Sequence, residues 1–318
     1  MKKFVLCALL ALPVTSCLLT VAAAAQATSS GTISGTVTDK SQAVIVGAEV
    51  TITSAATGAT RSVVTNDTGS FRFDLISAGN YTVKVAKGGF SAAEVKVEVL
   101  VGATANASVE LAAGSESQTI EVTGSTSLVD LAKTSVSTTI TPTEVEELPM
   151  VGRDVANLAY LAPGVKAADS YDPTKNRYAI LSVNGAGGRN VNVTVNGVDN
   201  KDNTVGGPVM QLPLEAVQEF QISTQRFSAE NGRSEGAAIN MITKAGSNNF
   251  HGSLFGYFRD TALDTDEKQA DGTGGQTPSH PDYSRQQFGG SVGGPIKKDK
   301  LFTFFALERE REHHNYAD

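Results

Sequence analysis

Histidine and cysteine are the side chains that most often bind a catalytic metal, and this chain has few of either. The four histidines are His251, His280, His313 and His314. None has the HExxH spacing, in which two imidazoles one helical turn apart hold zinc beside a glutamate base. Both cysteines, Cys7 and Cys17, lie near the N-terminus. We therefore predict no metal site and no cofactor, and we interpret His313 and His314 as solvent-exposed.

Two other patterns could support chemistry, and both have a simpler interpretation. Asp67 and Asp74 flank a turn and could offer carboxylates to calcium, but that ion needs six or more oxygen ligands, and no others stand nearby. The glycine-rich residues 184–190 lack the GxxxxGK[ST] spacing of a phosphate-binding loop and precede an alternating strand instead of a helix. With no catalytic set identified, we predict that the chain is not an enzyme.

Arg189 and Asp199 are oppositely charged residues at the two ends of one predicted strand and turn. They could be members of structural ion pairs, or they could contact a ligand. Both interpretations stay open, and the two residues are the only ligand-binding candidates that we name.

The N-terminus has the pattern of a signal peptide over residues 1–27. Lys2 and Lys3 precede an apolar run from Phe4 to Leu12, and small residues before position 28 offer a cleavage site. The residues before Cys17 also resemble a lipoprotein processing box, although the apolar run continues beyond it, so lipidation at Cys17 is left open.

The charge of the chain argues against nucleic acid as a partner. The net charge is −7, and loss of the leader with its two lysines would leave 24 basic and 33 acidic residues, a net charge near −9. Phosphate backbones attract basic surfaces, not acidic ones. No later segment has the ~18 consecutive apolar residues of a membrane helix, so any part that enters a membrane must do so as strands.

Residues 28–112 predict a β-sandwich of the transthyretin or immunoglobulin type. Short stretches rich in Val, Thr and aromatic residues alternate with Gly, Asn and Asp turns. In residues 81–85, Tyr81, Val83 and Val85 alternate with polar residues, which predicts a strand with one buried face and one solvent-exposed face. Residues 66–69 predict a turn in which Gly69 supplies a positive φ.

Residues 113–127 predict a flexible linker, and residues 128–246 a mixed α+β domain. The linker is rich in Gly and Ser but contains the β-prone residues Thr119, Ile120, Glu121, Val122 and Thr123. In the mixed domain, Thr141, Pro142 and Glu144 form the pattern of a capped helix start. Asp154 predicts a second short helix with an apolar face, composed of Val155, Leu158, Ala159 and Ala162.

The rest of the mixed domain predicts strands. Val191, Val193 and Val195 alternate with polar residues and lead into an Asn196–Gly197 turn. Pro213 then opens a helical turn, and two further strands follow within residues 217–244.

Residues 247–318 have the sequence pattern of outer-membrane barrel strands. Residues 250–259, 287–295 and 301–310 are aromatic-rich segments of about ten residues, the length that a transmembrane strand needs. A short charged turn at 296–300 and a long loop at 260–284 fit the same architecture. Adjacent Phe304 and Phe305 point to opposite faces, so the sequence does not determine which face meets lipid.

In order and spacing these segments resemble the N-terminal portion of a TonB-dependent outer-membrane receptor of the Oar-like type. "GTISGTVTDKSQAVIVGAEVTIT" and "TNDTGSFRFDLISAGNYTVKV" are similar to its carboxypeptidase regulatory-like sandwich. "LPMVGRDVANLAYLAPGV", "VNGVDN" and "EGAAINMITKAGSNNFHGSLFGYFRD" are similar to the plug and the first barrel strand. "GGSVGGPIKKDKLFTFFALERERE" is similar to the next strand pair.

The resemblance implies an energy-coupled importer. It makes residues 128–246 a plug, 247–318 the start of a barrel, and the sandwich a periplasmic domain of an outer-membrane protein. It also places the coupling segment, which a TonB-type energising protein would grip, at Thr119–Thr123. The transported ligand stays unknown. A linker without a coupling role is the alternative for that segment.

Two expectations concern the whole chain. About three strands cannot close a barrel of about 22, and open sheet edges in lipid leave backbone groups unsatisfied, so we expect the sequence to be a fragment or a truncated product. The alternative function is a secreted carbohydrate- or protein-binding sandwich module without transport activity, although residues 31–112 have few aromatic residues suited to stacking on sugars.

Overall fold

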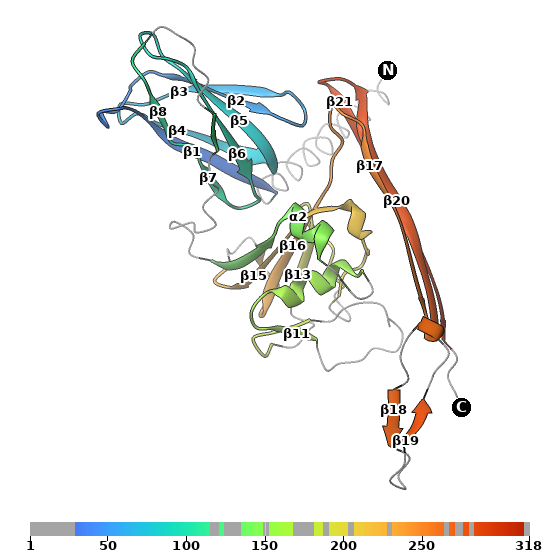
Figure 1. The fold of residues 1–318 in the computed structure, drawn as a ribbon. Coiled ribbons are helices and arrows are strands. Elements are labelled where there is room, and N and C mark those ends of the chain that lie inside the picture. The colour runs from blue at the N-terminus through green and yellow to red at the C-terminus, as the bar shows by residue number, and fades with distance from the viewer. Residues whose placement is uncertain are drawn as a thin grey trace, which may run out of the picture. The chain divides into compact units, whose positions relative to one another are not determined.

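The computed structural model describes residues 29–114, 121–123, 135–148, 150, 153–167, 181–186, 191–202, 207–227, 231–263, 267–270, 276–279 and 283–314 (Figure 1). The predicted leader with Cys17 lies outside these ranges, as do Thr119, Ile120 and Arg189. The chain divides into a larger unit up to Lys244 and a smaller one from Ala245 onwards, apart from the turn 298–300. No helix within the described ranges is long and apolar enough to span a bilayer.

The first part of the larger unit is a sandwich of two sheets (Figure 1). One sheet has the order β4-β1-β7, with β8 also paired to β1, and the other has the order β3-β2-β5-β6-β9. The strands are β1 (Ser30–Asp39), β2 (Glu49–Ser54), β3 (Thr60–Val64), β4 (Ser70–Ser77), β5 (Gly79–Ala86), β6 (Ala93–Val99), β7 (Thr104–Asn106), β8 (Val109–Leu111) and β9 (Glu121–Thr123). The predicted β-sandwich is confirmed.

The core of the sandwich follows the predicted alternation. Val83 and Val85 are fully buried and Tyr81 is half-buried, whereas Lys84 between them is exposed. Phe71 and Phe73 pack edge to face in the same core, with ring centroids 6.1 Å apart. The interior is therefore filled by alternate residues of both sheets, as the sequence period requires.

The turn at residues 66–69 also forms as predicted. Gly69 has φ +68°, and the Asn66 side-chain oxygen accepts hydrogen bonds from the backbone N–H groups of Thr68 and Ser70. Asp74, the other half of the alternative calcium interpretation, instead binds Arg72 at 2.8 Å. Among the described residues no group of three or more His, Cys, Asp or Glu side chains is arranged to hold a metal ion.

The second part of the larger unit is a mixed domain around one five-stranded sheet of order β10-β15-β16-β13-β14. A separate hairpin pairs β11 with β12. The elements of the mixed domain are β10 (Val136–Ile140), α2 (Pro142–Glu147), η1 (Val155–Leu161), β11 (Val165–Ala167), β12 (Leu181–Val183), β13 (Val191–Val195), β14 (Val198–Asp199), η3 (Leu214–Ala216), β15 (Val217–Gln225) and β16 (Ala237–Thr243).

The helix starts in this domain match the sequence predictions. The hydroxyl of Thr141 accepts from the N–H of Glu144, whose carboxylate accepts from the Thr141 N–H, which is a complete capping box. The carboxylate of Asp154 accepts from the N–H of Ala156 and caps η1, which is a 3-10 helix. The four residues predicted on its apolar face are all buried.

Strand β13 is confirmed, but its burial does not follow the alternation of its valines. Val191 and Val193 are buried, and so is Asn192 between them, whereas Val195 is only half-buried. β13 lies inside the sheet, parallel to β16, and interior parallel strands are covered on both faces. At the end of β13, Asn196 and Gly197 have φ +50° and +78°, the positive pair that a tight hairpin turn needs.

The smaller unit is built on three long antiparallel strands in the order β17-β20-β21 (Figure 1). Its elements are β17 (His251–Asp260), η5 (Thr261–Leu263), β18 (Glu267–Ala270), β19 (Gln276–Ser279), β20 (Tyr283–Lys297) and β21 (Leu301–His314). β20 and β21 have 15 and 14 residues, longer than the ten predicted. The loop predicted over 260–284 contains the β18–β19 hairpin, so the prediction of one long loop was wrong there.

Candidate coupling strand and membrane face

The last three residues of the predicted coupling segment, Glu121–Thr123, form the last strand of a sandwich sheet. β9 pairs in parallel with β6, with Glu94 opposite Glu121, Val95 opposite Val122 and Lys96 opposite Thr123. Only these three residues of the segment are described. The sequence predicted that these residues favour β-structure, and they do form a strand. The sheet with which this strand pairs belongs to the sandwich.

Strand β6 has a partner strand on each side. Towards β5 it is paired from Gly79–Val99 to Val85–Ala93, and towards β9 the described residues 121–123 pair with residues 94–96. Ala93, Val95, Val97 and Val99 are buried, and the residues between them are charged: Glu94, Lys96 and Glu98. Charged side chains on an edge strand discourage indiscriminate strand addition, so this edge can accept a short strand without being a general aggregation site.

The chain that leaves β6 is bonded to β15 in the same unit. Both carboxylate oxygens of Glu219 lie 3.1 Å from the backbone N–H of Val101, and the Gln221 side chain donates to the Val101 carbonyl at 3.3 Å. Glu219 is only 1% exposed. A buried carboxylate is costly unless donors surround it, so these bonds hold the turn after β6 against β15.

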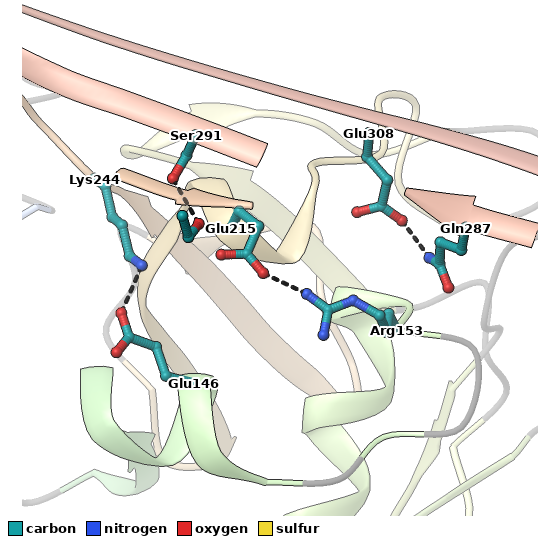
Figure 2. Close-up of polar contacts among 8 residues, drawn as sticks. Glu146, Arg153, Glu215, Lys244, Gln287, Ser291 and Glu308 are labelled. Carbon is teal, nitrogen blue, oxygen red and sulfur yellow. Dashed lines mark hydrogen bonds and ion pairs between the residues drawn. The ribbon is translucent and has the colours of Figure 1, made fainter. Parts of the chain in front are cut away.

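Two ion pairs join the short helices of the mixed domain to other elements of the same domain (Figure 2). Arg153, just before η1, donates to Glu215 of η3 at 2.6 Å. Lys244, just after β16, donates to Glu146 of α2 at 2.7 Å. These pairs link elements that are far apart in the sequence. The four charged side chains therefore help to hold the domain together.

Of the two weak ligand candidates, only Asp199 is described. Its carboxylate pairs with Arg233 at 2.8 Å and accepts from the Lys201 backbone N–H at 3.0 Å. Burial, and secondarily the charge of Arg233, lower the pKa of Lys201. Asp199 is thus a member of an ion pair, with a partner 34 positions away that no spacing rule would indicate.

One face of the three-stranded sheet of the smaller unit carries many exposed apolar side chains, and also Arg309 and Arg311 of β21. The register places Leu254, Gly290 and Leu307 side by side, followed by Gly252, Val292 and Phe305. Leu254 is 93% exposed and Phe258, on the same face, 73%. An outward apolar band is what a barrel strand presents to lipid. Phe305 therefore lies on the lipid-type face.

The opposite face carries cross-strand polar and aromatic contacts. Gln287 donates to Glu308 (Figure 2), Arg285 lies 3.2 Å from Glu310, and Tyr283 donates to Glu312 at 2.8 Å. Further contacts on this face are the stacked rings of His251 and Phe304, the Ser253–Ser291 bond and the Arg259 guanidinium over the Tyr283 ring. The three glutamates of the alternating run 308–312 thus share one face, and its arginines lie on the other.

Comparison with known proteins identifies two of these parts. A family model described as "Carboxypeptidase regulatory-like domain" matches residues 32–112, and one described as "Outer membrane beta barrel domain" matches residues 242–318. The TonB-dependent transporter Oar of Myxococcus xanthus is 30% identical over 286 residues, which cover 86% of this chain. The chain is a homologue of the Oar TonB-dependent transporter. It spans 26% of the length of that relative.

Solved structures similar to this Oar homologue include an outer-membrane transporter and a siderophore receptor. The transporter YddB of Escherichia coli is 15% identical with a TM-score of 0.44, over 55% of this chain and 26% of that one. The siderophore receptor PirA of Acinetobacter baumannii is 21% identical with a TM-score of 0.39, over 56% and 24%. The barrel-domain match and the homology to Oar place the protein in the outer membrane.

The sequence of the Oar homologue also contains two GxSxG stretches, at 232–236 and 289–293, which resemble the site of a serine nucleophile. That site needs a sharp strand-to-helix turn. Ser291 instead lies within β20, opposite Ser253, and Ser234 precedes β16 and donates to the Ala237 carbonyl at 2.5 Å. Neither serine has the required setting, and the Oar relative is a transporter, not an enzyme.

Proposed function

We propose that this Oar homologue provides the periplasmic domain, the plug and the first barrel strands of an energy-coupled outer-membrane importer. In this proposal residues 28–112 are the periplasmic sandwich, 113–127 the linker, 128–246 the plug and 247–318 the start of the barrel. The observation that carries it is the sheet β17-β20-β21, with exposed apolar side chains gathered on one face and cross-strand hydrogen bonds and ion pairs on the other. Such a sheet is suited to a wall between lipid and a wet lumen.

The structure of the mixed domain supports the plug role. It has its own core around Leu158, Phe220 and Ile222. The Lys244–Glu146 pair ties α2 to the end of β16, and the Arg153–Glu215 pair ties the start of η1 to η3. It enters β17 after the short stretch that follows Lys244. A pull applied before residue 128 would reach this domain through the chain itself, because the linker is the only covalent connection on that side.

The coupling partner in this proposal is a TonB-type periplasmic energising protein. The segment Thr119–Thr123 adopts strand structure at Glu121–Thr123, and an extended strand binds a partner sheet through main-chain hydrogen bonds. The cargo is a ligand of unknown class. Asp199, with its Arg233 partner, and Arg189 are candidates for ligand contact within the plug.

The test is deletion of residues 119–123 in the full-length receptor. Cells carrying it are screened for growth and uptake on a panel of siderophores, saccharides and peptides, with and without the proton gradient. We expect loss of energised uptake while the receptor still reaches the outer membrane. A deletion of equal length at 124–128 is the control for linker shortening. Energised uptake that survives loss of 119–123 would rule out the coupling role.

A further inference from the structure

Two arginines lie on the outward face of the sheet β17-β20-β21, beside its apolar side chains. Arg309 and Arg311 share this face with Phe305 and Leu307, because alternate residues of β21 point to the same side. Both arginines are exposed. We propose that they bind the phosphate groups of a lipid in the outward-facing leaflet of the outer membrane. The inference rests on the proposed function, which makes these strands the start of a barrel wall.

The connections between the strands indicate which end of the wall the arginines occupy. β20 and β21 are joined by the short turn at residues 298–300, whereas β17 and β20 are joined by a longer connection that contains the β18–β19 hairpin. Outer-membrane barrels have short turns on the periplasmic side and longer loops outside. Arg309 and Arg311 lie in the half of β21 that is nearer the long connection, so they belong to the outward-facing end.

The length of β21 places both arginines at the border of the hydrocarbon. Leu301 is exposed directly after the charged turn 298–300, so it marks the inner border. Arg309 and Arg311 follow it by eight and ten residues along the same strand. At ~3.4 Å per residue and a tilt of about 40°, these steps rise about 21 and about 26 Å, and the apolar band of such a barrel is about 25 Å tall. A guanidinium group at that height reaches the headgroups.

The neighbouring side chains suit a lipid border. The register places Phe288 beside Arg309, and it places Gln286 and Phe258 in the row of Arg311. Phe258 and Phe288 are both exposed, and aromatic side chains form girdles at the borders of the apolar band. The apolar stems of the two arginines can lie along such a surface while their charged ends reach the headgroups.

The carboxylates of these three strands lie away from the two arginines. The glutamates of residues 308–312 are on the opposite face, where Glu310 is 3.2 Å from Arg285. On the outward face, the acidic side chain among the described residues of these strands is Asp260 of β17, two strands from β21, and it accepts from the Ala262 N–H at 3.0 Å. Arginine binds phosphate through two parallel hydrogen bonds. A phosphorylated headgroup therefore supplies the charge and the geometry that the arginines need.

The lipid that stays bound to the full-length receptor tests this inference. The receptor is purified from outer membranes in a nonionic detergent, and native mass spectrometry counts the phosphorylated glycolipid that it retains. We expect Arg309→Gln with Arg311→Gln to retain about tenfold less, because both phosphate contacts are lost. The control is Lys298→Gln with Lys300→Gln, which removes equal charge at the inner border and should leave retention unchanged. Equal retention in the two double variants would overturn the inference.

A second measurement uses the unchanged receptor, so it does not depend on the assembly of a variant. The delipidated receptor is titrated with diphosphorylated lipid A and with the same lipid after removal of its phosphates. We expect the dephosphorylated lipid to bind about tenfold more weakly. Inorganic phosphate should not displace the lipid, because the acyl chains also contact the apolar band. Equal affinity for the two lipids, or displacement by inorganic phosphate, would contradict a site for lipid phosphate.

The remaining outcomes separate this inference from the proposed function. If the unchanged receptor is not a heat-modifiable barrel, the proposed function fails, and the lipid site fails with it. If the barrel assembles and the Arg309→Gln, Arg311→Gln variant keeps its lipid but loses heat-modifiability, the arginines pair with carboxylates of a neighbouring barrel strand. In that case only the lipid site is wrong.

Discussion

Arg153 and Glu215, 62 positions apart, meet in an ion pair of 2.6 Å whose side chains are 13% and 16% exposed. The pair joins Arg153, two residues before η1, to η3, the 3-10 helix that leads into β15. Removing one member of a well-buried pair leaves an uncompensated charge, at a cost of about 3–5 kcal/mol, whereas replacing both by apolar groups is often neutral.

We therefore expect Glu215→Ala to lower the free energy of unfolding of the mixed domain by about 2–4 kcal/mol, slightly less than for full burial. Arg153→Met combined with Glu215→Leu should recover most of the loss. Urea denaturation of the single and double variants measures this. Arg72→Ala is the control, because the Arg72–Asp74 pair is more than half exposed and such pairs contribute about 0–1 kcal/mol. A loss for Glu215→Ala as small as that of the control would contradict the structural role.

The Glu219–Val101 contact predicts a local change in hydrogen exchange. Glu219→Ala removes the acceptor of a buried backbone N–H, at a cost of about 1–3 kcal/mol. We expect the Val101 amide to exchange about ten- to hundredfold faster. Glu219→Gln keeps one acceptor oxygen and should change the rate less. Mass spectrometry of the peptide that contains Val101 reads this out, and an unchanged rate in Glu219→Ala would disprove the bond.

The two faces of β17 should respond differently to charge. Leu254 lies on the exposed apolar face, and an arginine facing lipid near mid-bilayer costs about 2–4 kcal/mol. In the full-length receptor we expect Leu254→Arg to reduce the fraction of assembled, heat-modifiable barrel. Ser253→Asn, on the opposite face beside Ser291, should assemble normally. Equal defects in both variants would mean that the faces are wrongly assigned.

Asp39 predicts a pH effect in the sandwich. Hydrogen bonds from the Ser41 hydroxyl and the Ala43 N–H, with a further bond from the Ser41 N–H, hold the pKa of Asp39 below its ordinary value of 3.8. A lowered pKa in the folded state means that the stabilisation is present above the unfolded value and is lost as the pH falls through the folded one. NMR titration should place the Asp39 midpoint below 3.8, and Ser41→Ala should move it upward. A midpoint that Ser41→Ala leaves in place would contradict the cause.

Features that depend on neighbours in the chain could be predicted from the sequence alone. The capping box at Thr141 and Glu144, the Asp154 cap and the Asn196–Gly197 turn follow from short-range hydrogen bonding and from φ preferences. The sandwich strands follow from the period of two in their residues. The β-prone character of residues 119–123, the proposed coupling segment, could be predicted for the same reason.

Pairings between distant residues were decided by the tertiary structure. Asp199 binds Arg233, 34 positions away, and Glu219 binds Val101, 118 positions away. Strand β9 pairs with β6 of the sandwich. In residues 308–312, the sequence shows only that negative and positive side chains alternate. The register with β20 decides that the glutamates, and not the arginines, lie beside Gln287 and Arg285. Local propensity acts over a few residues, whereas sheet order and register are set by which apolar faces are buried together.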